Sequence, residues 1–288
     1  MNIDRVGPIS VAEFHAEFVV PRKPVVLTRA IEDWPALSTW SPEWFRETWG
    51  TRKVRCRGAK GETTLAEYID GLAGSTMESP SPYLRNLNIQ TDWPELAPAI
   101  SPRCAYTQDD WLSSRVLPAG WPRAAKHLNQ LFISGTGTYI PLHFDDWMMH
   151  AFISNVHGDK RFVLYPPGQA DLLYPRDDYY LVSRFPNPFE VDLGEFPRFA
   201  EATPLSIDLH KGESVFIPCG WWHTTRTLSP CISVSSNFVC ESNWNDFADE
   251  LCHMRDRLGG RTWKTPLIRG YLALAGQALR SGRRLRLH

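Results

Sequence analysis

The sequence lacks the features that mark membrane and metal-knuckle proteins. Its 288 residues contain no apolar run that approaches the length needed to cross a bilayer, roughly 18–20 residues. The first ten residues, MNIDRVGPIS, lack the charged and then apolar pattern of a secretory signal. The six cysteines include no C-x-x-C pair, which argues against a zinc knuckle or a disulfide framework. We therefore expect a cytoplasmic protein with reduced thiols and no membrane partner.

An excess of charge of one sign is also missing. The 31 Lys and Arg residues nearly balance the 32 Asp and Glu residues, for a formal net charge of -1. This balance gives no strong signature of binding to nucleic acid or acidic lipid. Hydrophobic residues make up 43% of the chain, which is enough for a sizeable core. The composition is therefore that of a compact globular protein.

The pattern of short apolar segments divides the chain into three regions. Residues 1–81 alternate short helices and strands, and residues 82–240 carry short strands separated by Gly and Pro turns. Such strands are typical of a barrel or sandwich, and the Pro-, Asp- and Tyr-rich insertion 166–204 is a candidate lid. Residues 241–288 return to helical spacing. We expect one domain over residues 1–240 with a helical extension after it.

A His-x-Asp pattern is the first candidate for a metal site. His143 and Asp145 are two residues apart at the end of an expected strand over Thr138–His143, so their side chains would share a face. The pattern alone is weak, because His-x-Asp or His-x-Glu occurs three times among nine histidines. We interpret His15 as a surface residue of a helix, and His157 as part of a hairpin turn.

A third ligand must come from elsewhere, and the best source is His223 in the segment GWWH. Two imidazoles and one carboxylate on one side of a metal form the facial triad of non-haem iron(II) oxygenases. The alternative is that His143 is a hydrogen-bonded core histidine and that Trp221 and Trp222 are ordinary core aromatics. Spacing alone leaves both interpretations open.

Two longer segments carry a family resemblance. PLHFDDWMMHAFISNVHGDKRFVLYPP and KGESVFIPCGWWHTTRTLSPCISVSSNFV resemble the jumonji C, cupin-like family of iron(II)- and 2-oxoglutarate-dependent oxygenases. The resemblance is strongest to the branch with the factor-inhibiting-HIF asparaginyl hydroxylase and the jumonji lysyl hydroxylase. It implies a mainly β fold, a double-stranded β-helix (jelly-roll) core with N-terminal α/β elements and C-terminal helices. It also implies His143, Asp145 and His223 as catalytic metal ligands, with 2-oxoglutarate and dioxygen as cosubstrates.

The resemblance assigns further residues to the cosubstrate and the substrate. Lys160 falls where the family pairs a lysine with the distal carboxylate of 2-oxoglutarate, and Ser235 falls where a hydroxyl donates to the same carboxylate. The remaining positions are Tyr83 and Asn237 near the cosubstrate, and Arg85, Asp146 and Trp147 near the substrate.

Some positions depart from the family pattern. Ile140 replaces the Thr or Ser often found three residues before the first ligand, which removes a hydroxyl from the cosubstrate pocket. The usual asparagine of the following strand has no exact counterpart, although Asn155 is nearby. His150 is expected to be a pocket-wall or structural histidine rather than a ligand.

The leading functional hypothesis is hydroxylation of a peptide or protein side chain, with the substrate lying across the barrel mouth. The alternatives are N-methyl demethylation, in which Trp147 and Tyr139 could form part of a cage for a methylated cation, and a non-catalytic cupin-like binding module. Free amino acid, RNA and modified-peptide substrates also remain open. We further expect a homodimer through the C-terminal helices, because an apolar stripe there is longer than docking requires: Trp244, Phe247, Leu251, Met254 and Leu258.

Overall fold

A seven-stranded sheet forms one wall of the barrel in the computed structural model, which describes residues 3–57, 59, 61–117, 129–259 and 263–286. Its strand order is β1-β2-β10-β7-β12-β6-β5, and all neighbours are antiparallel except β1 and β2. The strands are β1 (Asp4–Val6), β2 (Val25–Leu27), β5 (Leu84–Asn88), β6 (Asn129–Ser134), β7 (Ala151–His157), β10 (Ser214–Ile217) and β12 (Cys231–Ser236).

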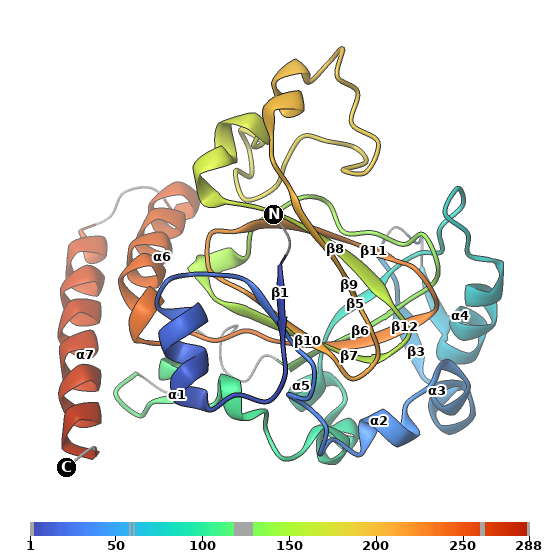
Figure 1. Cartoon of the computed structure of the whole chain (residues 1–288), viewed down its shortest axis with the longest axis horizontal. Coiled ribbons are helices and arrows are strands. Elements are labelled where there is room, and N and C mark those ends of the chain that lie inside the picture. The colour runs from blue at the N-terminus through green and yellow to red at the C-terminus, as the bar shows by residue number, and fades with distance from the viewer. Residues whose placement is uncertain (1–2, 58, 60, 118–128, 260–262, 287–288) are drawn as a thin grey trace.

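A three-stranded antiparallel sheet, in the order β11-β8-β9, forms the opposing wall. Its strands are β8 (Lys160–Tyr165), β9 (Leu205–Leu209) and β11 (Trp222–Thr227). Buried side chains of both sheets meet between them, for example Phe162 and Leu164 of β8 with Val215 and Ile217 of β10. The two facing sheets form a jelly-roll barrel, as expected (Figure 1).

The N-terminal helices cover the outer face of the large sheet. They are α1 (Val11–Phe14), α2 (Ala36–Thr39), α3 (Pro42–Trp49), α4 (Leu65–Gly71) and α5 (Ile89–Asp92), and a two-stranded sheet of β3 (Lys53–Arg55) and β4 (Glu62–Thr64) lies beside α4. Capping boxes begin α1 at Ser10 and α4 at Thr64, where each side chain accepts the amide three residues on. Phe14 packs edge-on against Phe152 and Phe216 of the sheet, so this region belongs to the main core.

Two long helices, α6 (Trp244–Gly259) and α7 (Lys264–Arg286), lie side by side on one flank of the barrel (Figure 1). Trp244 and Phe247 of α6 are buried in a cluster with Leu272 of α7 and with Trp111. The first two residues of the apolar stripe therefore pack inside this chain. The dimer that the sequence predicts through these helices stays a prediction. The side chain of Leu258 lies outside the described residues.

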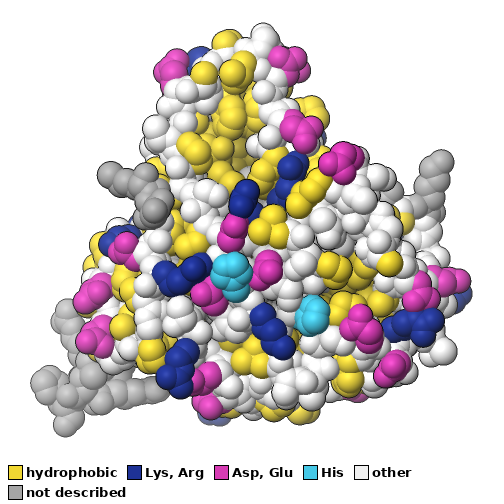
Figure 2. Space-filling model, turned by 45° about the vertical axis from the view of Figure 1, so that its right-hand side comes forward, with side chains coloured by type: hydrophobic (Ala, Val, Ile, Leu, Met, Phe, Trp, Pro, Cys, Tyr) yellow, Lys and Arg dark blue, Asp and Glu magenta, His cyan; other side chains and the backbone are white. Residues whose placement is uncertain are grey.

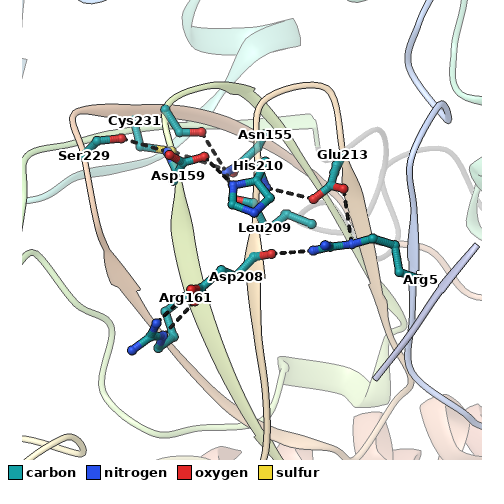
Figure 3. A network of polar contacts seen from close by, with 11 residues as sticks. Arg5, Asn155, Asp159, Arg161, Asp208, Leu209, His210, Glu213, Ser229 and Cys231 are labelled. Carbon is teal, nitrogen blue, oxygen red and sulfur yellow. Dashed lines mark hydrogen bonds and ion pairs between the residues drawn. The ribbon is translucent and has the colours of Figure 1, made fainter. Parts of the chain in front are cut away.

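Hydrogen bonds and ion pairs connect the three-stranded sheet to β1, the N-terminal strand (Figure 3). Arg161 of β8 forms a bidentate pair with Asp208 of β9, and Arg5 donates to the carbonyl of Asp208 and pairs with Glu213. Figure 2 shows a face on which basic and acidic side chains are interspersed. No helix among the described residues is long and apolar enough to cross a membrane.

Three local predictions from the sequence were wrong. Residues Thr138–His143 form only isolated bridges at Tyr139 and His143, because the prolines and glycines around them interrupt a regular ladder. The sequence analysis did not identify β11 as a strand, because its sequence WHTTRT is polar although the strand is buried almost throughout. His15 is half-buried at the start of a π-helical turn, 3.9 Å from Asp109, rather than on the surface.

Candidate metal centre and adjoining pocket

One backbone pair holds His143 and His223 opposite each other. The amide of His143 donates to the carbonyl of His223 at 3.0 Å, and the amide of His223 donates back at 2.6 Å. The imidazole rings lie on the same side of this pair, with centroids 4.4 Å apart. Gly220, at a φ of 76°, provides the left-handed turn that leads the chain into β11 just before His223. Residues 80 positions apart therefore present their rings to one point.

Each imidazole is oriented by its Nδ1 atom. Nδ1 of His143 lies 2.8 Å from the carbonyl oxygen of Pro141, and Nδ1 of His223 lies 3.1 Å from that of Trp221. Because a carbonyl only accepts hydrogen bonds, Nδ1 carries the proton and Nε2 keeps its lone pair. Histidine ligands of metals are commonly fixed in this way.

Asp145 completes a cluster of three metal-ligating side chains. A carboxylate oxygen of Asp145 and one nitrogen from each of the two histidines lie within 4.8 Å of one another. Oδ1 of Asp145 is 3.8 Å from Nε2 of His143, too far for a hydrogen bond but suitable for two ligands of one ion. Oδ2 accepts a hydrogen bond from Nδ2 of Asn237 at 3.4 Å.

Burial sets the protonation of this cluster. It lowers the pKa of His143 to about 3, with a smaller contribution from His223, so the ring is neutral at neutral pH. Burial also raises the pKa of Asp145, because a carboxylate without a nearby cation is costly there. The neutral imidazole of His143, beside a carboxylate that lacks a cation, is in the state that binds a divalent metal, and two histidine nitrogens with one carboxylate oxygen suit iron(II).

A pocket of about 850 Å³ opens beside the cluster. All ten residues that the sequence analysis assigned to ligands, cosubstrate or substrate line this one pocket: Tyr83, Arg85, His143, Asp145, Asp146, Trp147, Lys160, His223, Ser235 and Asn237. Ile140 lines it as well, so the departure from the family pattern affects the pocket itself.

Lys160 is the most unusual residue of the pocket. It is 2% exposed, and its Nζ donates to the hydroxyl oxygens of Tyr83 at 3.0 Å and Ser233 at 2.7 Å. Every Asp and Glu of the chain is among the described residues, and none of them forms an ion pair with Lys160. A buried ammonium without a carboxylate is costly, so this position is suited to an anionic ligand.

The serine beside Lys160 is not the one named from the sequence. Ser233 contacts Lys160, whereas Ser235 donates to Oδ1 of Asn237 at 2.7 Å, on the side of Asp145. Both serines lie on the same face of β12, because alternate residues of a strand point the same way. That alternation in SVSS was a usable signal for Ser233. The structure thus places Ser235 in a relay from Ser235 through Asn237 to Asp145.

The insertion 166–204, which the sequence predicts as a candidate lid, forms a wall of the pocket. The amide of Phe144 donates to the carbonyl of Leu181, and His143 forms a bridge with Val182, so the insertion pairs directly with the ligand segment. Tyr179 donates to Asp146 at 2.7 Å. Just beyond, Trp147 adopts a φ of 58°, an uncommon backbone conformation for a bulky residue that turns the chain back beside the pocket.

Other candidates lie outside the pocket. His150 is fully buried, with Nδ1 accepting from the amide of Cys219 and Nε2 bonded to Ser242, so its role is structural. Asn155 donates to the carbonyls of Gly158 and Leu209. The hydroxyl of Tyr139 donates to Pro186, and Tyr139 is not among the pocket residues. Lining residues that the sequence analysis missed include Arg57, Gln130, Tyr179 and Ser233.

The jelly-roll barrel and its two-histidine, one-carboxylate cluster define the class of non-haem metal proteins with a facial triad. The comparison with protein families agrees, because residues 11–243 match the model described as "Cupin-like domain". The chain belongs to this cupin-like family.

Several curated proteins are similar to this chain. "2-oxoglutarate and iron-dependent oxygenase JMJD4" of Gallus gallus is 25% identical, over 92% of this chain and 67% of its own length. "Lysine-specific demethylase JMJ21" of Arabidopsis thaliana is 28% identical, over 84% of this chain and 26% of its own. "Arginine-specific demethylase JMJ20" of Arabidopsis thaliana is 24% identical, over 86% and 61%. The chain thus spans between a quarter and two thirds of the length of these relatives.

Proposed function

We propose that this protein is an iron(II)- and 2-oxoglutarate-dependent oxygenase that hydroxylates a side chain of a peptide or protein. The observation that carries the proposal is Lys160, a buried ammonium with no acidic partner, in the same pocket as the His143, Asp145 and His223 cluster. The names of relatives such as the Gallus gallus oxygenase support the same reaction class.

The two ends of the pocket have different roles in this proposal: one holds 2-oxoglutarate and the other holds the metal. Lys160, held by Tyr83 and Ser233, would bind the distal carboxylate of 2-oxoglutarate, and a hydrogen-bonded ammonium suits a carboxylate there. When bound, iron(II) and 2-oxoglutarate supply the oxidation: 2-oxoglutarate becomes succinate and CO2, one oxygen atom of O2 enters succinate, and the other enters the C–H bond of the substrate.

The remaining residues orient the Asp145 carboxylate and enclose the pocket. Asn237 donates to one oxygen of Asp145, which leaves the other free to face the metal, and Ser235 fixes the amide of Asn237 in turn. The insertion pairs with the ligand segment at Phe144 and covers one side of the pocket. This cover limits the access of water to the reacting atoms.

The alternative reaction is N-methyl demethylation, in which aromatic side chains hold a methylated cation. Trp147 lines the pocket and Tyr139 does not, but Phe144, Tyr179 and Phe185 also line it, so the product and not the lining separates the two reactions. The test is intact-mass analysis of a peptide mixture treated with protein, iron(II), 2-oxoglutarate and air. We expect products heavier by one oxygen atom that retain all their carbons. Loss of methyl groups with release of formaldehyde, or an unchanged mixture, would contradict the proposal.

We also propose that two copies associate through α7. Its outer face carries the exposed apolar side chains of Leu267 and Leu274, which are 62% and 66% exposed, and Trp263, which is 75% exposed, directly precedes the helix. Leu267 and Leu274 are seven residues apart and lie on one side of the helix, so a second copy could cover them together. A cytoplasmic location is proposed as well, supported by six buried cysteines that form no disulfide. Fractionation of cells that express the chain tests the location.

A further inference from the structure

A β-bulge at the mouth of the pocket aims Arg85 inward. On β5, Leu84 pairs with Ile133 and Leu87 pairs with Leu131, so Arg85 and Asn86 together face the single residue Phe132. Asn86 has a φ of 62°, and both bulge residues line the pocket. Bulges next to active sites commonly redirect a side chain, and this one adds a cation two residues beyond Tyr83, which directly precedes β5.

Arg57 lies on the neighbouring segment and lines the same pocket. Its amide donates to the carbonyl of Tyr83 at 2.9 Å, which places it beside the start of β5. Its charge also reaches the opposite wall: burial raises the pKa of the Tyr179 hydroxyl, and the positive charge of Arg57 opposes that rise. Arg57 and Arg85 therefore belong to one side of the mouth, and the guanidinium of Arg57 acts across it.

Neither arginine has an acidic partner. No carboxylate among the described residues, which contain all 32 Asp and Glu residues, forms an ion pair with Arg57 or Arg85. By contrast, Arg55, two residues before Arg57, pairs with Glu62 at 3.6 Å, and Arg176 on the insertion pairs with Asp178. Two cations are thus left without partners at the entrance, outward of the position assigned to 2-oxoglutarate.

We propose that Arg57 and Arg85 bind a carboxylate of the substrate and so select peptide segments with an acidic group close to the hydroxylated residue. A guanidinium presents paired N–H donors that match a carboxylate, which suits this position better than a point charge would. The inference rests on the proposed function and adds the chemical class of its substrate. The carboxylate can come from an Asp or Glu side chain or from a peptide C-terminus.

The test uses two matched pools of fluorescent 12-residue peptides, amidated at the C-terminus. One pool contains Asp and Glu at randomised positions, and the other contains Asn and Gln at those positions. Binding is measured by anisotropy with the full chain, iron(II) and 2-oxoglutarate in the absence of dioxygen. A third pool, neutral but with a free C-terminus, separates the two sources of carboxylate, and a polyuridine competitor detects a preference for phosphate.

We expect the acidic pool, or the pool with a free C-terminus, to bind about tenfold more tightly than the amide pool. Arg57→Ala and Arg85→Ala should each reduce this preference, whereas Arg55→Ala, whose side chain pairs with Glu62 instead, should keep it. Equal binding of all pools, a preference that survives in both variants, or binding of polyuridine alone would overturn the inference. Succinate formation by the unmodified protein is measured in parallel, so that failure of the proposed function is recognised separately.

Discussion

His143 and His223 exchange both of their backbone hydrogen bonds, so the positions of the two imidazoles are fixed by main-chain atoms. Because these bonds do not depend on the side chains, removal of one imidazole leaves the barrel connection intact. We therefore expect the frame of this candidate metal centre to fold without the three side chains that it carries.

The first prediction follows from this arrangement. His143→Ala, Asp145→Ala and His223→Ala should each abolish turnover of 2-oxoglutarate, because each removes one of three protein ligands, while the circular dichroism spectrum stays that of the folded chain. His210→Ala is the control, because His210 directly follows β9, is not among the pocket residues and bonds to Asp159. Turnover retained by Asp145→Ala would contradict the assignment of the metal centre.

The second prediction concerns Lys160. Lys160→Met should raise the KM for 2-oxoglutarate by two orders of magnitude or more, on the basis of the roughly 3–5 kcal/mol lost when one partner of a buried ion pair is removed. The same variant should melt at a higher temperature than the unmodified protein when no 2-oxoglutarate is present, because it lacks a buried charge without a partner. Its neighbour Arg161, which pairs with Asp208 on the surface, provides the control Arg161→Ala.

Steady-state kinetics measures the effect of Lys160→Met on the KM for 2-oxoglutarate, and thermal unfolding measures its effect on the melting temperature. If the KM of Lys160→Met is unchanged, the carboxylate binds elsewhere, and Arg85 is the next candidate. If added 2-oxoglutarate raises the melting temperature of the variant as much as that of the unmodified protein, Lys160 has no part in binding it.

The sequence was sufficient to predict the metal-ligand and 2-oxoglutarate residues, but it did not predict which distant segments contact one another. The ligand triad and Lys160 were found because short motifs, His-x-Asp and GWWH among them, resemble a known family. Ser233 was missed because the family resemblance points to Ser235 alone, although strand alternation places both serines on the same face of β12. The pairing of Phe144 with Leu181 is a contact between distant segments, which local patterns do not encode.

The third prediction is a pH dependence of stability that comes from His150. Burial lowers its pKa to about 3, below the value of about 6.5 in an unfolded chain, so the unfolded state binds more protons between these two values. The stabilisation from His150 is therefore complete above about pH 6.5 and is lost as the pH falls toward 3. His143 contributes in the same direction.

Urea unfolding at several pH values checks this prediction. His150→Gln should show a shallower loss of unfolding free energy between pH 6.5 and 4 than the unmodified protein, whatever its stability at neutral pH. An identical slope in His150→Gln would show that His150 is not a source of the acid sensitivity.

The fourth prediction concerns the outer face of α7. If two copies meet there, the double substitution Leu267→Glu and Leu274→Glu should convert a dimer into a folded monomer, because it places four charges in the proposed contact. Light scattering after size-exclusion chromatography measures the mass. A monomer at micromolar concentration for the unmodified chain would contradict the proposal, as would a dimer that survives both substitutions.

The most direct test of the central claim is the fate of dioxygen during turnover. The protein is incubated with iron(II), 2-oxoglutarate and ¹⁸O₂, and succinate is analysed by mass spectrometry. We predict succinate that carries one ¹⁸O atom, formed only when metal, 2-oxoglutarate and dioxygen are all present, and absent with Asp145→Ala. No succinate from the iron-loaded, unmodified protein, or succinate without the label under conditions that exclude exchange with water, would contradict the account.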